Sequence, residues 1–180
     1  VGYNYRLSDL LAAVAIPQVH RLSQLRIERV KLADLLTDAL EGVDVLSPPR
    51  IRTDCTHSYY LYPMLYQSDV LGISRDVFLE ALQAEGVHAA RYVTPIYLLP
   101  IFQKHQRPGD PGFERIFPMY DNECSYSRGS CPTVERVEDE EIMVTNICRP
   151  PNTEHEISEF VSAVSKIVEN ADELRARVEH

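Results

Sequence analysis

The sequence predicts an α/β protein, more narrowly an α+β small domain. In this fold a long helix that contains a proline leads into a small, mainly antiparallel sheet packed with helices. Three observations support the prediction. An apolar-periodic run opens the chain, short tyrosine- and valine-rich segments alternate with helical ones further on, and a capped amphipathic helix closes it. Helices that alternate with strands around a small sheet are typical of α/β and α+β folds.

The first predicted element is a long helix over residues 8–41, in which leucines recur at three- and four-residue steps. Ser8 suits the N-cap, and Gly42 suits a left-handed C-cap. Pro17 interrupts the pattern, at a cost of about 3 kcal/mol in a straight helix. We therefore expect either a kink or two helices, over residues 8–16 and 17–41.

Three segments are predicted as strands: residues 55–66, 87–93 and 142–148. The first is rich in tyrosine, which favours extended structure. Pro63 cannot donate a ladder hydrogen bond, so the strand is predicted to be at an edge there, or bulged. Aromatic residues occupy both of its faces, which favours burial on both sides.

Three further helices are predicted downstream of the long one. Ser74 caps a helix that runs to about Glu85, and residues 131–140 form a short acidic helix. Thr153 and Glu156 form a capping box that opens a last helix, which runs to about residue 177. Residues 103–129 are a long polar connection, which is uncommon in a compact domain unless it has a function.

Composition limits the classes of partner. The formal net charge of −9 argues against nucleic acid or an anionic membrane as a partner. No run of 18 apolar residues predicts a membrane span, and no signal peptide is visible. The four cysteines lack zinc spacing, so we expect reduced thiols in a cytoplasmic protein, although a Cys124–Cys131 disulfide stays possible.

A family resemblance begins at the N-terminus. Residues 2–13 read Gly-Tyr-Asn-Tyr-Arg-Leu-Ser-Asp-Leu-Leu-Ala-Ala. This stretch resembles the signature of the DegT/StrS-type aminotransferases, pyridoxal-phosphate enzymes that aminate keto sugars and keto cyclitols, including nucleotide sugars. Residues 86–100 and 131–135 are similar to two later family segments, so the match follows the chain in order. Arg91 and Tyr97 depart from it, because the family often has histidine at both positions.

The resemblance implies the C-terminal half of a fold-type I enzyme that acts as a homodimer. Residues 1–41 would be a linking or interface helix at the end of the large domain, and residues 42–180 the small domain. Asn4 would hydrogen-bond the phosphate of pyridoxal 5'-phosphate held by the neighbouring subunit. Arg6 would contact substrate or brace its loop. Without the resemblance, Asn4 suits a turn and Arg6 a surface position.

Two further residues are candidate substrate contacts. His57 lies in the first predicted strand, where the alternative is a packed core residue. Tyr92 could point its phenol into a site. Arg91 could hold a carboxylate or phosphate bidentately, or it could form a surface ion pair.

Transamination with pyridoxal phosphate requires a lysine that forms a Schiff base. The chain has three lysines: Lys31, Lys104 and Lys166. None lies in the Ser/Lys context that the family uses, so we expect the catalytic lysine outside this chain. Two alternatives stay open: a sugar dehydratase of the same family, in which histidine replaces that lysine, and a non-catalytic dimerisation or interaction module.

Overall fold

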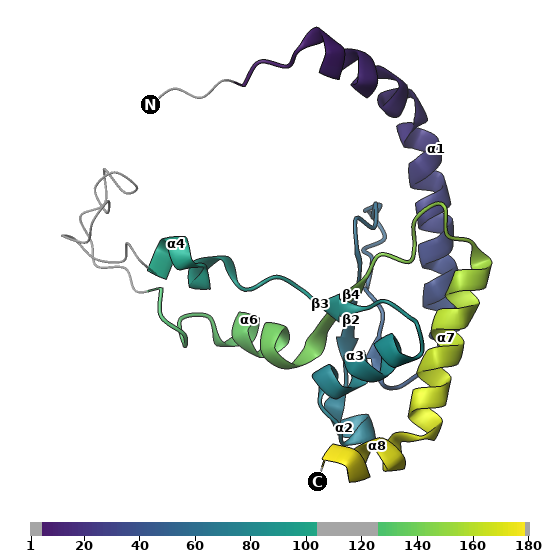
Figure 1. Ribbon diagram of the computed structural model, residues 1–180, viewed down its shortest axis with the longest axis vertical. Coiled ribbons are helices and arrows are strands. Elements are labelled where there is room, and N and C mark those ends of the chain that lie inside the picture. Colours follow the sequence, from purple (N-terminus) through teal and green to yellow (C-terminus); the bar gives the residue numbers. More distant parts are fainter. Residues whose placement is uncertain (1–4, 104–125, 179–180) are drawn as a thin grey trace, which may run out of the picture.

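A computed structural model of the chain describes residues 5–103 and 126–178 (Figure 1). A four-stranded antiparallel sheet stands at its centre, in the order β1-β2-β4-β3. The strands are β1 (Leu46–Ser47), β2 (Tyr62–Tyr66), β3 (Ala90–Arg91) and β4 (Ile142–Thr145). The predicted α+β class with a mainly antiparallel sheet is confirmed.

The register of β2 against β4 defines two faces of the sheet. Met64 lies opposite Met143, and Leu65 lies opposite Ile142. Because residues that pair across antiparallel strands share a face, each face can be followed across both strands. The first, here called the covered face, carries Tyr62, Met64, Tyr66, Met143 and Thr145, all nearly inaccessible. The second, here called the open face, carries Pro63, Leu65, Ile142 and Val144.

Helices pack against the covered face. The principal two are α3 (Arg75–Ala84) and α7 (Glu154–Glu169), which contact each other. The ring of Phe78, on α3, lies 4.9 Å from the ring of Tyr66. Phe78 and Phe160 are fully buried, so the hydrophobic core lies between this face and its helices.

The first helix, α1 (Asp9–Ala39), is a single 31-residue element that passes through Pro17. The two-helix alternative is therefore wrong. Figure 1 shows the helix curving along its first half, and such curvature accommodates a proline ring inside a helix. Ser8 is the N-cap, as predicted, and accepts the amide hydrogen of Leu11 at 3.3 Å.

The two halves of α1 differ in their surroundings. Leu32, Ala33 and Leu36 are buried in the domain core, and α1 contacts α7. The earlier turns expose 54–76% of several large apolar side chains: Leu10, Leu11, Val14, Ile16, Val19, Leu22 and Ile27. The apolar pattern that predicted the helix therefore continues well beyond the part that this domain buries.

All three predicted strands are shorter than expected, and the third, predicted over residues 142–148, is strand only over Ile142–Thr145. Residues 55–61 are not strand, because Tyr59 adopts a left-handed backbone (φ +48°) and turns the chain before β2 begins. The segment predicted over residues 87–93 pairs only at Ala90 and Arg91. Burial on both faces is wrong as well, because Tyr60 is 78% exposed and Leu65 is 37% exposed.

The prediction that the strand lies at a sheet edge at Pro63 is correct. Strand β1 pairs only with Leu65 and Tyr66, so it ends before it reaches Pro63. Pro63 pairs with Val144 of β4 on its other side. A proline is tolerated there because one side of the strand has no neighbour that needs its missing donor.

The later helices largely match prediction. Ser74 caps α3, and the Thr153–Glu156 capping box opens α7. Residues 132–141 are α6 (Pro132–Arg136) followed by a π-helical turn, η2 (Val137–Glu141). The predicted last helix breaks at Asn170, after which α8 (Ala171–Val178) follows. Short elements that prediction missed are β1, α2 (Ser68–Leu71), η1 (Ile96–Leu98) and α4 (Pro100–Gln103).

The described ranges contain no helix that is both long and apolar enough to span a membrane. Cys55, Cys131 and Cys148 are free thiols, and Cys124 lies outside the described residues. Burial raises the pKa of Cys148 to about 12, so this thiol stays protonated.

Candidate functional site

A hollow of about 330 Å³ lies over the open face of the sheet and brings His57 and Tyr92 together. Both were predicted as substrate contacts. Its lining combines apolar side chains with hydroxyl groups and an imidazole. The lining residues are His57, Ser58, Tyr60, Leu61, Pro63, Tyr92, Ile142 and Val144.

The strand register explains how Tyr92 reaches this hollow. Arg91 pairs with Met143, so it points to the covered face. Tyr92 follows Arg91, and successive side chains of an extended chain point to opposite faces. The phenol ring therefore lies on the open face, where it is 44% exposed.

The turn before β2 fixes the tautomer of His57. Its Nδ1 accepts the backbone N–H of Tyr59 at 2.9 Å, and the two rings lie 4.4 Å apart. A neutral imidazole whose Nδ1 accepts carries its proton on Nε2. His57 can therefore present an N–H donor to a ligand.

The hollow suits a small neutral ring with polar substituents. Ser58, Tyr60 and Tyr92 add hydroxyl groups that can donate or accept, while Ile142 and Val144 offer apolar surface. None of the residues lining this hollow is a lysine, arginine, aspartate or glutamate. The residues of this hollow therefore do not fit a phosphate-bearing cofactor such as pyridoxal phosphate.

The structure does not bring Arg6 to this hollow. Arg6 is exposed and lies three residues before α1 begins, and the first core residues of that helix, Leu32 and Ala33, lie 26 and 27 residues after it. At 1.5 Å per residue the helical part of this separation, from Asp9 to Leu32, is about 35 Å, and Figure 1 shows the helix leading away from the sheet. Asn4, the predicted cofactor contact, lies outside the described residues.

Two of the three lysines are occupied in ion pairs. Lys31 pairs with Glu154 at 2.7 Å, and Lys166 pairs with Glu85 at 2.7 Å. Neither lines the hollow that holds His57 and Tyr92. Lys104 lies outside the described residues.

Arg91 forms an ion pair, one of the two roles open to it. Its Nε donates to Oδ1 of Asp76 at 2.7 Å, and its Nη2 donates to Oδ2. The Arg91 guanidinium, with a further contribution from Arg75, holds the pKa of Asp76 below its ordinary value. Arg91 is thus bound bidentately by a carboxylate of its own domain.

Sequence reasoning missed Arg75, the most buried charged residue in the described ranges, with 2% of its surface exposed. Its guanidinium donates to the carbonyl oxygens of Glu138, Asp139 (2.8 Å) and Ile142 (3.1 Å). Glu138 and Asp139 belong to η2, and Ile142 is the first residue of β4. Carbonyl oxygens in the last turn of a helix lack a partner within the helix and favour a cation. Arg75 followed by Asp76 in the first turn of α3 gave only a helix signal in the sequence.

A second hydrogen-bonded cluster joins the two chain segments that flank residues 104–125. The carboxylate of Glu135 accepts the Tyr97 hydroxyl and the backbone N–H of Gly129 at 2.7 Å. The Tyr97 hydrogen bond is the main reason why the pKa of Glu135 lies below its ordinary value. Burial and this hydrogen bond raise the pKa of Tyr97 to about 12. Tyr97 therefore serves as a structural donor in this fold.

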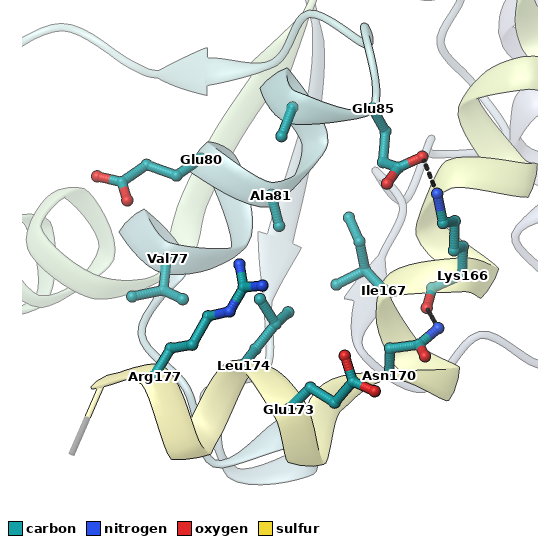
Figure 2. A pocket seen from close by; sticks show the side chains of 11 residues that line it. Val77, Glu80, Ala81, Glu85, Lys166, Ile167, Asn170, Glu173, Leu174 and Arg177 are labelled. Carbon is teal, nitrogen blue, oxygen red and sulfur yellow. Dashed lines mark hydrogen bonds and ion pairs between the residues drawn. The ribbon is translucent and has the colours of Figure 1, made fainter. Parts of the chain in front are cut away.

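A larger hollow of about 500 Å³ lies between α3, α7 and α8 (Figure 2). Val77, Ile167 and Leu174 form its apolar part, and Figure 2 shows the Arg177 side chain reaching between α8 and α3. It shares no lining residue with the hollow on the open face. Of the predicted site residues that the structure describes, Arg6, His57 and Tyr92, none lines it.

Fold and hollow together define a small α+β domain with a ligand-sized pocket on one sheet face. The model of the DegT/DnrJ/EryC1/StrS aminotransferase family matches residues 1–116, which is more than half of the 180 residues. The chain belongs to this family.

Curated relatives match most of the chain, and solved structures share its fold. An uncharacterized protein of Methanocaldococcus jannaschii is 27% identical over 167 residues, covering 93% of this chain and 38% of that protein. The fold resembles that of S. venezuelae DesV in complex with a ketimine intermediate (TM-score 0.70, 20% identity, 93% and 38% covered). It also resembles DesI in the presence of its TDP-sugar product (TM-score 0.72, 16% identity, 99% and 40% covered). The chain spans about two fifths of the length of the curated relatives it matches.

Proposed function

We propose that this chain is the C-terminal part of a pyridoxal-phosphate-dependent aminotransferase. The complete enzyme would transfer an amino group from glutamate or glutamine to a keto sugar or keto cyclitol. The observation that supports this most is the hollow on the open face, where His57 and Tyr92 meet in a chain of an aminotransferase family.

The chemistry of the hollow suits the sugar end of such a substrate. A pyranose ring has an apolar C–H surface, which can lie on Tyr92 and Val144. Its hydroxyl and carbonyl oxygens can accept from Nε2 of His57 and exchange hydrogen bonds with Ser58. The TDP-sugar product of DesI favours a nucleotide-linked sugar as the substrate of this chain as well.

The difference between the two halves of α1 supports a division into domains. We propose that residues 1–41 link the two domains and residues 42–180 form the small domain. A helix that is apolar on several sides is normally buried on several sides. The exposed leucines and isoleucines of the first half would then pack on the large domain and on the second subunit of a homodimer.

The cofactor would be held outside the described residues. Asn4 would donate its side-chain amide to the cofactor phosphate of the neighbouring subunit, and Arg6 would contact the substrate or brace its loop. The catalytic lysine would come from the part of the enzyme beyond this chain, because none of Lys31, Lys104 and Lys166 lies in the Ser/Lys context of the family. The pairing of Lys31 and Lys166 with glutamates supports this proposal.

The test uses the intact protein, loaded with pyridoxal phosphate, and a nucleotide-linked keto sugar. With glutamate or glutamine as donor, we expect amino-sugar formation and a matching amount of the donor's keto acid. Loss of a sugar hydroxyl with release of ammonia and without formation of an amino sugar, the donor being converted to its keto acid, would instead support the dehydratase. If neither reaction occurs and the protein does not bind the cofactor, a non-catalytic module would replace this proposal.

A further inference from the structure

Tyr92 enters the hollow from a strand that is held at very few points. Strand β3 pairs with β4 only through Ala90 and Arg91, and no strand pairing follows Arg91. Before β3, the Thr145 hydroxyl donates to the carbonyl oxygen of His88 at 2.9 Å. The register of β3 sets the face on which Tyr92 lies, but after Arg91 the backbone has no ladder, so a further interaction is needed to hold Tyr92 in place on that face.

The ion pair between Arg91 and Asp76 is that interaction. It holds the Arg91 side chain on the covered face with both carboxylate oxygens engaged. A bidentate pair fixes orientation as well as distance. Because Tyr92 is the next residue, a fixed Arg91 places the phenol on the opposite face.

Asp76 is itself held from the interior. Nε and Nη2 of Arg75 both donate to its Oδ1 at 3.3 Å. The same guanidinium donates to the carbonyl oxygen of Ile142, which lines the hollow together with Tyr92. The chain of contacts from Ile142 through Arg75, Asp76 and Arg91 therefore connects two walls of one pocket.

We propose that Asp76 is a positioning residue that acts through Arg91 to place Tyr92 against the sugar ring of the substrate. Asp76 belongs to α3, which packs on the covered face, and it does not line the hollow on the open face. Its effect is on how well the pocket is shaped before the substrate binds, so it should change affinity more than turnover. This inference rests on the proposed function, since it takes the hollow to be the sugar site.

The test compares Asp76→Asn and Arg91→Gln in the intact protein with Glu80→Gln as the matched control. Glu80 lies one turn along α3 from Asp76, and Figure 2 shows it at the other hollow. For both test variants we expect the KM for the keto sugar to rise about tenfold, roughly the loss of one well-placed hydrogen bond. The kcat should stay within about twofold, because no reacting group changes.

Three further results separate positioning from general damage to the fold. Arg91→Lys keeps the charge but loses the bidentate geometry, so its KM should lie between that of the unaltered protein and that of Arg91→Gln. The double variant should be no worse than either single variant, because both break the same contact. If Asp76→Asn lowers the melting temperature strongly, the KM of Arg91→Gln still tests the proposal. The Arg91 side chain is 55% exposed, so its substitution should leave the fold stable.

A fluorotyrosine placed at position 92 gives a readout that needs no catalysis. Its fluorine resonance should shift and broaden in Asp76→Asn and remain unchanged in Glu80→Gln. An unchanged resonance together with an unchanged KM would overturn the proposal. If the intact protein aminates no keto sugar, the proposed function is wrong, but the resonance still tests whether Asp76 places Tyr92.

Discussion

The two faces of the sheet share four strands but have different surroundings. On the covered face, Met64 and Met143 are essentially inaccessible beneath α3 and α7. On the open face, Leu65 remains 37% exposed, and a hollow collects His57 and Tyr92. The difference indicates that the covered face determines stability while the open face is free to bind. Substitutions on the two faces should therefore have different effects.

The largest expected effect is the removal of a core ring from the covered side. Phe78 is fully buried and lies 4.9 Å from the ring of Tyr66. Phe78→Ala should lower the free energy of unfolding by about 3–5 kcal/mol, because it loses buried area and leaves a cavity. Urea denaturation of the intact protein measures this loss. Leu65→Ala on the open face is the control and should cost less than about 1 kcal/mol.

A smaller effect is expected from the contact that joins α1 to the sheet. Thr37 donates its hydroxyl hydrogen to the carbonyl oxygen of Ala33, so Tyr62 must donate in the 2.6 Å contact between the two hydroxyls. Tyr62→Phe should cost about 1 kcal/mol of unfolding free energy. Tyr60→Phe, in a side chain that is 78% exposed, should leave stability unchanged. Equal losses in both variants would contradict the distinction between the faces.

The smallest effect concerns the Glu135 cluster, and it depends on pH. The folded pKa of Glu135 is depressed, mainly by the Tyr97 hydrogen bond, relative to about 4.3 in an unfolded chain. A depressed pKa contributes stability above the unfolded value, which is lost as the pH falls through the folded pKa. Glu135→Gln should therefore lower the melting temperature at pH 7, with a difference that shrinks in acid. A constant difference down to pH 3 would contradict this assignment.

Sequence reasoning was most reliable where a signal is local. The Thr153–Glu156 capping box and the Ser74 cap each occupy a few consecutive residues, and both form as predicted. The prediction that residues 55–61 are strand is wrong because Tyr59 takes a left-handed backbone, which no alternation of residue types reveals.

The candidate site shows the same limit. His57 and Tyr92 were each proposed separately, and only the fold places them in one hollow. The Arg91–Asp76 pair joins residues 15 positions apart on a strand and a helix. Composition cannot predict such a pair, because either residue alone suits an exposed surface.

The most direct test of the open face as the binding surface is the affinity of the intact protein for a nucleotide-linked keto sugar. Isothermal titration should show the dissociation constant of Tyr92→Ala raised at least about tenfold, since a stacked ring and a hydroxyl are both lost. Arg177→Ala, in the hollow between α3 and α8, should bind as the unaltered protein does. Unchanged affinity in Tyr92→Ala, or weakened binding in Arg177→Ala alone, would contradict the account.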